Sequence, residues 1–207
     1  MRVPFNVYAD FESFTPQLST CQSNPDKSYT KRYQKHIPSG FCYHINCFDD
    51  TLYSQEPVTF VNEYDDDDVA QIFIDTLEKN IKEIYKKFRF RKGMIMTMHD
   101  KMTYDNFTLC HIWNEELGKD RGRDQYHLTG KFRGAAHEIG NLKYKIPKFF
   151  PVVFHNLLGY ESYLFIKTLG NIKGDISCIP SKEENYISFT KQVIVDKFVN
   201  EEGKRSM

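Results

Sequence analysis

The chain has 207 residues, of which 40% are hydrophobic and 27% are charged. This length and composition predict one globular domain, or one domain with a smaller insertion, and exclude a disordered chain. The 28 Lys and Arg residues equal the 28 Asp and Glu residues, so no overall basic field attracts nucleic acid and any such binding must be local.

Targeting signals and cysteines indicate a compartment only broadly. No apolar run of about 18 residues is present, which argues against a membrane span and a membrane partner. The first residues are too short and interrupted to form a signal peptide. Five cysteines, an odd number without a secretion signal, indicate reduced thiols and therefore an intracellular protein.

Short β-prone runs bounded by turn residues recur along the chain and predict strands. These runs are residues 3–9, 40–47, 51–54, 149–154, 176–179, 186–189 and 193–198. Apolar residues at helical spacing predict a long helix over 65–89 and a shorter one over 161–169, ended by Gly170. Residues 109–145 are polar and glycine-rich, which marks an insertion. The mixture of strands and helices predicts the α/β class.

Two acids, Asp10 and Glu12, follow the first predicted strand. In an extended segment residues i and i+2 point to the same side, so both carboxylates share one face, where hard cations such as Mg²⁺ find oxygen ligands. Taken alone, an Asp-x-Glu pair is better explained by two solvated acids at a strand end. A second segment, after a buried strand, supplies an amide, an aromatic ring and a third acid: Asn156, Tyr160 and Glu161. Asn156 could bond a DNA end, which Tyr160 could stack on or brace.

Residues 8–12 and 151–161 resemble the first two exonuclease motifs of family B DNA polymerases, most closely the protein-primed viral, organellar and Polinton (Maverick) transposon type. The resemblance covers nearly the whole chain and implies an RNase H-like (DnaQ-like) 3′–5′ exonuclease fold over 1–62 and 146–207, interrupted by a helix and linker at 63–108. It implies that Mg²⁺ or Mn²⁺ is bound by the acids and that a single-stranded 3′ end is gripped by the other two residues. The acids are Asp10, Glu12 and Glu161, and the DNA-binding residues are Asn156 and Tyr160.

The chain departs from this family at two points. Position 161 is Glu where the family has Asp, and the extra methylene moves the carboxylate by about 1.5 Å. The third exonuclease motif, Tyr-x-x-x-Asp, is missing, because Thr190 follows Tyr186 at that spacing and Lys167 follows Tyr163. Neither Asp175 nor Asp196 fits the motif. The polymerase palm is expected beyond Met207, so these residues are not expected to add nucleotides.

The insertion at 109–145 resembles the endonuclease VII type of HNH module, which such polymerases often carry between the two motifs. Cys110 and His137 stand at zinc-ligand positions, whereas Trp113 and Gly140 stand where two cysteines belong. Two ligands cannot close a tetrahedral zinc site, so zinc is not expected. An irregular loop with chance histidines predicts the same behaviour.

The catalytic positions of this module are also incomplete. Asp124, His127 and Asn141 keep theirs, but Gln125 replaces the base His and cannot take a proton at neutral pH. No cleavage is therefore expected from the module. Basic residues in and around it could still contact phosphates, and a solvated basic face is an equally good explanation.

Three functional hypotheses remain open. The leading one is a fragment or degenerate copy of a family B polymerase, whose family replicates DNA and proofreads it, with weak single-stranded DNA binding and little catalysis. The second is an active Mg²⁺-dependent 3′–5′ exonuclease, and the third a domesticated, non-catalytic DNA- or protein-binding module. The nucleus suits a DNA partner, and no stable protein partner can be inferred.

Overall fold

The computed structural model describes residues 3–18, 34–63, 67–90, 92–143, 147–182 and 185–195. The protein is a mixed α/β protein whose chain divides into two compact units. The sheet unit comprises residues 5–82 and 150–207, and the insert unit comprises residues 1–4 and 83–149. The insertion in the sheet unit therefore begins at residue 83, rather than at residue 63. In the part of the chain described, none of the helices has the length and apolar character needed to cross a membrane.

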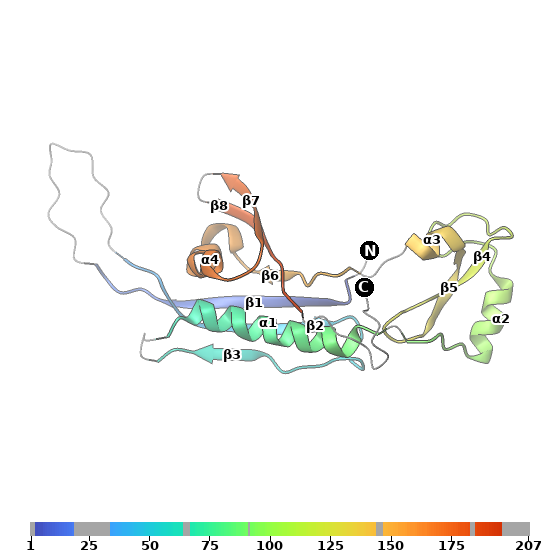
Figure 1. Ribbon diagram of the computed structural model, residues 1–207, viewed down its shortest axis with the longest axis horizontal. Helices are drawn as coiled ribbons and strands as arrows, with labels where there is room; N and C mark the ends of the chain where they lie inside the picture. Colours follow the sequence, from blue (N-terminus) through green and yellow to red (C-terminus); the bar gives the residue numbers. More distant parts are fainter. Residues whose placement is uncertain are drawn as a thin grey trace. The chain divides into compact units, whose positions relative to one another are not determined.

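The sheet unit is built on a four-stranded mixed sheet in the order β3-β2-β1-β6. Its strands are β1 (Phe5–Phe14), β2 (Ile37–Cys47), β3 (Val58–Val61) and β6 (Val152–Phe154). The first three strands pair antiparallel, whereas β6 joins β1 in parallel. Figure 1 shows β1 running between β6 and β3.

Alternation along β1 produces the core of the sheet unit. Phe5, Val7, Ala9 and Phe11 are buried on one face, and the residues between them are more exposed. Helix α1 (Val69–Phe88) packs on this face through Phe73, whose ring centroid lies 4.9 Å from that of Phe11. The apolar spacing predicted for residues 65–89 thus forms a helix from residue 69, and residues 65 and 66 lie outside those described.

A second helix and a hairpin complete this aromatic core. Helix α4 (Ser162–Asn171) follows a single π-helical turn, η1 (Leu157–Glu161), and its Phe165 stacks on Phe11 with centroids 5.8 Å apart. Strands β7 (Ile176–Lys182) and β8 (Asn185–Lys191) form an antiparallel hairpin. Phe189 of β8 meets Phe165 edge-on, and Lys191 pairs with Glu78 of α1.

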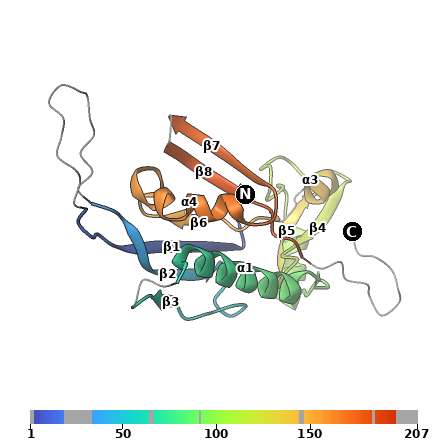
Figure 2. The same ribbon diagram turned by 60° about the vertical axis from the view of Figure 1, so that its left-hand side comes forward.

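The insert unit holds a helix, α2 (Met98–Asn106), a hairpin of β4 (Arg121–Gln125) and β5 (Phe132–His137), and a short helix, α3 (Glu138–Lys143). Thr97 and Asp100 form a reciprocal capping box at the start of α2, which fixes that helix although none of its residues is buried. Figure 2 shows α3 beside the hairpin, which it contacts on both strands.

Three predicted elements differ from the structure. The strand predicted at 51–54 is wrong, because the Asp49 side chain accepts a hydrogen bond from the Thr51 amide and holds a turn there. Residues 193–195 form no strand, and residues 196–198 lie outside those described. Gly170 lies within α4, which ends at Asn171.

Candidate functional site

The predicted site lies where parallel strands β1 and β6 end their pairing. The register runs from Val7 opposite Val152 to Ala9 opposite Phe154. Asp10 and Glu12 come next on β1, and residues 156–161 follow β6, so both groups emerge at the same edge of the sheet. The acidic tip of the first strand therefore lies beside the segment near residue 160.

Glu161 is the buried centre of this edge, with a relative exposure of 3%. Its carboxyl group accepts a hydrogen bond from the Phe11 amide, just beyond the last residue of β1 that pairs with β6, and shares a hydrogen bond with Asp10. Burial, followed by the hydrogen bond and charge of Asp10, raises the pKa of Glu161 to about 8, and the charge of Glu12 contributes in the same direction. Without a cation, Glu161 is therefore protonated at neutral pH.

One oxygen of Glu161 has no partner. Its Oε2 atom is buried and makes no hydrogen bond. A buried carboxyl oxygen without a partner, next to a second carboxyl group, is an arrangement that a cation stabilises by replacing the shared proton. Asp10 and Glu12 are exposed on β1, with a bulge between Glu12 and Ser13 that reorients the strand end.

A complete metal centre is not preformed. Across the described ranges, no three or more His, Cys, Asp and Glu side chains are grouped closely enough to hold an ion. Asp175, considered above as a replacement for the missing third motif, is exposed before β7, and Asp196 lies outside the described residues. Asp10 and Glu161 fit a divalent cation as a contacting pair, and Glu12 is close enough to act on them through its charge.

Asn156 begins the π-helical turn that carries Glu161. Its side-chain oxygen accepts a hydrogen bond from the Gly159 amide at 3.1 Å. A Cβ at position 159 would lie 2.5 Å from that oxygen, so a glycine is required for this close approach. The side-chain oxygen of Asn156 is thus bonded within the turn, and its NH2 group is the donor that could contact a DNA end.

Tyr160 ties the same turn to the first two strands. Its hydroxyl group bonds to the Ser13 hydroxyl and lies 2.9 Å from His36 Nδ1, and the two rings meet edge-on at 5.3 Å. Tyr160 is thus braced against β1 and the start of β2. Neither Ser13 nor His36 is among the site residues predicted from the sequence. The pairing of Phe14 with Ile37 brings them together, and only the strand register could have indicated it.

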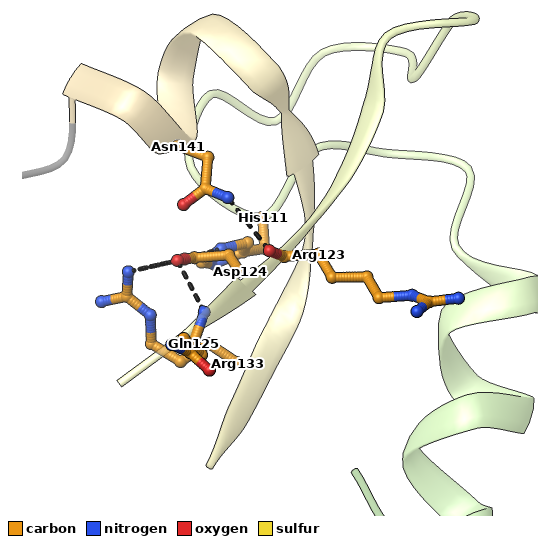
Figure 3. A network of polar contacts seen from close by, with 6 residues as sticks. All are labelled: His111, Arg123, Asp124, Gln125, Arg133 and Asn141. Atoms are coloured by element: carbon orange, nitrogen blue, oxygen red, sulfur yellow. Dashed lines mark hydrogen bonds and ion pairs between the residues drawn. The ribbon is translucent and has the colours of Figure 1, made fainter. Parts of the chain in front are cut away.

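Asp124 is the centre of a polar network in the insert unit (Figure 3). It is buried, with a relative exposure of 1%. Arg133 Nη2 lies 2.7 and 2.6 Å from its two oxygens, His111 Nε2 lies 2.7 Å from Oδ2, and the Gln125 amide donates to Oδ1 at 2.8 Å. Two basic side chains already compensate this carboxylate, so it does not fit a divalent metal ion.

The other catalytic positions of the HNH-like segment also make structural contacts. The side-chain amide of Asn141 donates to the Arg123 carbonyl at 3.0 Å (Figure 3). Gln125 donates to the Lys92 carbonyl at 3.2 Å, and the backbone carbonyl of His127 accepts from the Lys92 amide at 2.9 Å. The segment predicted as irregular therefore contains an ordered hairpin, to which these bonds attach α3 and the chain near Lys92.

Of the four positions at which the resemblance implies zinc ligands, three lie together and form an aromatic stack. Trp113 stacks on His137 with ring centroids 5.3 Å apart and planes inclined by 30°. A Cβ at Gly140 would lie 3.1 Å from the indole, so the indole covers that glycine. His137 Nδ1 bonds Asp120 at 2.9 Å, and Cys110 is fully buried. Two of the four residues have no metal-binding atom, and the set does not fit zinc.

Comparisons with protein-family models, with curated proteins and with solved structures found no match to this chain.

Proposed function

We propose that the sheet unit is an RNase H-like exonuclease domain of the protein-primed family B DNA polymerase lineage, which binds the 3′ end of single-stranded DNA with a divalent cation and cleaves it slowly or not at all. The insert unit would be a degenerate HNH-like module that neither binds zinc nor cleaves DNA. The observation that carries this proposal is the buried Glu161 carboxyl group against Asp10, at the shared end of β1 and β6.

The residues of this edge would divide the work between them. Asp10 and Glu161 would hold the cation, and Glu12, one strand period from Asp10, would add negative charge or a third ligand. When bound, Mg²⁺ would polarise a phosphodiester and activate water. Tyr160, braced by Ser13 and His36, would fix the position of the turn that presents Asn156 and Glu161 to the DNA end. The absence of a further carboxylate from the described part of the site explains why cleavage would be slow.

Binding of a labelled single-stranded oligonucleotide, with Ca²⁺ or with EDTA, tests this proposal. We expect Ca²⁺ to tighten binding of an oligonucleotide with a free 3′ hydroxyl at least tenfold. Asp10→Asn should abolish that gain, whereas Glu56→Gln, which removes an exposed acid elsewhere in the sheet unit, should preserve it. Equal affinity with Ca²⁺ and with EDTA would contradict the proposal.

The same preparation distinguishes the second candidate, an active exonuclease, which the unpartnered Glu161 Oε2 favours. With Mg²⁺ and excess protein, progressive shortening from the 3′ end that Asp10→Asn abolishes would establish nuclease activity. Unchanged DNA after long incubation, together with Ca²⁺-dependent binding, would leave the non-catalytic function.

A further inference from the structure

The two units divide the charge of the chain unequally. The insert unit contains 15 Lys and Arg against 8 Asp and Glu, a formal charge of +7. The sheet unit contains 13 against 20, a formal charge of −7. The net charge of zero therefore conceals a basic unit joined to an acidic one, a distribution typical of a local polyanion-binding surface.

Strand β4 places the charged groups of the Asp124 network on one face and two further arginines on the other. Successive residues of a strand point to opposite faces, so Asp124 lies on one side and Arg121 and Arg123 on the other. Figure 3 shows the Arg123 side chain extending away from the Asp124 network. Arg133 belongs to that network and neutralises Asp124, whereas Arg123 extends from the opposite face.

An aromatic ring supports the arginines on this face. The Arg121 guanidinium lies 4.3 Å and that of Arg123 5.1 Å from the centroid of the Tyr104 ring of α2. The Tyr104 hydroxyl donates to the Arg121 carbonyl at 3.2 Å, and Phe132 packs edge-on against its ring. The ring therefore holds two guanidinium groups in place before any ligand binds.

Cations of this face remain available to a ligand. Arg123 is exposed, as is Lys119, two residues before Arg121. Within the ranges that the structure describes, neither Arg123 nor Lys119 forms an ion pair with an acid. Arg121 and Arg123 thus present two basic groups beside an aromatic ring, and Lys119 adds an exposed amine in the turn that leads into the strand.

We propose that Lys119, Arg121, Arg123 and Tyr104 form a binding surface for the phosphate backbone of single-stranded nucleic acid. A guanidinium group can donate two parallel hydrogen bonds to one phosphate, and its flat face can stack on a base. Both properties favour nucleic acid over an acidic protein segment as the ligand. This surface requires neither the carboxylates nor the cation of the sheet unit, so it goes beyond the function proposed above.

The test measures fluorescence anisotropy of a labelled single-stranded oligonucleotide in EDTA over a range of KCl concentrations. The full chain is compared with Lys119→Ala/Arg123→Ala and with a matched control, Lys167→Ala/Lys173→Ala, which removes two exposed lysines of the sheet unit. Loss of two phosphate contacts should make the negative slope of log K, the association constant, against log salt shallower by about 1.4. This corresponds to roughly a 25-fold loss of affinity near 0.1 M salt. The control should change neither quantity, and Arg123→Lys should retain most of the slope.

The outcomes separate this surface from the carboxylate site. EDTA-resistant binding that persists in Asp10→Asn and is lost in Lys119→Ala/Arg123→Ala supports the proposal, even if the cation-dependent function fails. Equal affinity and slope in the wild type and in this double variant would overturn it. Salt-sensitive self-association without oligonucleotide binding would also overturn it, since the acidic unit of a second copy would then be the partner.

Discussion

The two units each bury one carboxyl group, and the surroundings of these groups are opposite in kind. Asp124 of the insert unit accepts bonds from Arg133, His111 and a backbone amide. Glu161 of the sheet unit meets another acid, Asp10, and has an oxygen without a partner. A buried carboxylate whose two oxygens both have basic partners is compensated within the fold, whereas a buried carboxyl group in contact with a second acid destabilises the fold unless a proton or a cation intervenes.

The contrast between Asp124 and Glu161 shows that a residue at a predicted catalytic position can have a structural role instead. Asp124 keeps the residue type of a metal ligand, but Arg133 supplies the positive charge within the chain. The Trp113 indole likewise lies against His137 and Gly140, where the resemblance implies a metal ion. The insert unit thus holds itself together with its own side chains, while the sheet unit retains an unsatisfied acidic pair that suits a ligand.

The largest expected effect reverses this difference by returning a metal to the insert unit. Trp113→Cys/Gly140→Cys would add two thiolates at positions that already contact each other, one of them stacked on His137, with Cys110 as the fourth ligand. We expect the double variant to bind one Zn²⁺ per chain, with a free energy on the order of 10 kcal/mol at neutral pH. Cobalt titration, followed by the absorption of tetrahedral thiolate–cobalt complexes, measures this binding.

A matched variant controls for the loss of the aromatic stack. Trp113→Ala/Gly140→Ala removes the indole without adding thiolates, and it should bind no cobalt while losing stability. If the cysteine variant also binds none, then the four positions do not converge as the module resemblance implies. Binding of cobalt with the same affinity by the unaltered chain would show that Trp113 does not exclude a metal.

The next effect concerns the compensated carboxylate. Asp124→Asn leaves Arg133 and His111 without their charged partner in a buried place, so the free energy of unfolding should fall by about 3 to 5 kcal/mol. Urea denaturation followed by fluorescence reports on this unit, because Trp113 is the sole tryptophan. Asp120→Asn, which removes a carboxylate that is 47% exposed and bonded to His137, should cost no more than about 1 kcal/mol. Equal losses in both variants would contradict the structural role of Asp124.

Sequence periodicity predicted the elements whose cores are regular. Alternation around Val7 and helical spacing around Phe73 reflect burial on one face, and both segments form the expected strand and helix. The pair of acids after the first strand and the segment ending at Glu161 were also found, because two parallel strands bring their carboxyl ends to one edge. Turn chemistry overrode β-propensity at residues 51–54, where Asp49 fixes the backbone.

Hydrogen-bond partners that lie far apart along the chain could not be predicted from such patterns. Arg133 and His111 reach Asp124 only through the hairpin register and the preceding loop, and His36 reaches Tyr160 through the pairing of β1 with β2. The unequal charge of the two units could not be calculated from the sequence alone, because the boundary between the units lies within the long helix. Pairwise contacts over more than a hundred residues, such as that of Ser13 with Tyr160, leave no local signal.

The smallest effect tests the uncompensated carboxyl pair through its pH dependence. The pKa of Glu161 is raised to about 8 in the folded state, above its ordinary value near 4.5. Between these values the unfolded chain loses the proton and the folded chain keeps it, so stability is full below about pH 4.5 and falls as the pH rises towards 8. Glu161→Gln should remove this loss of a few kcal/mol, flattening the profile of unfolding free energy in urea between pH 5 and pH 8, whereas Glu56→Gln should leave it unchanged. Mg²⁺ should act on the unaltered chain in the same direction as the variant, because a bound cation favours the ionised pair. A wild-type profile that stays flat over this range would show that Asp10 and Glu161 do not share a proton, and the proposed cation site would lose its main support.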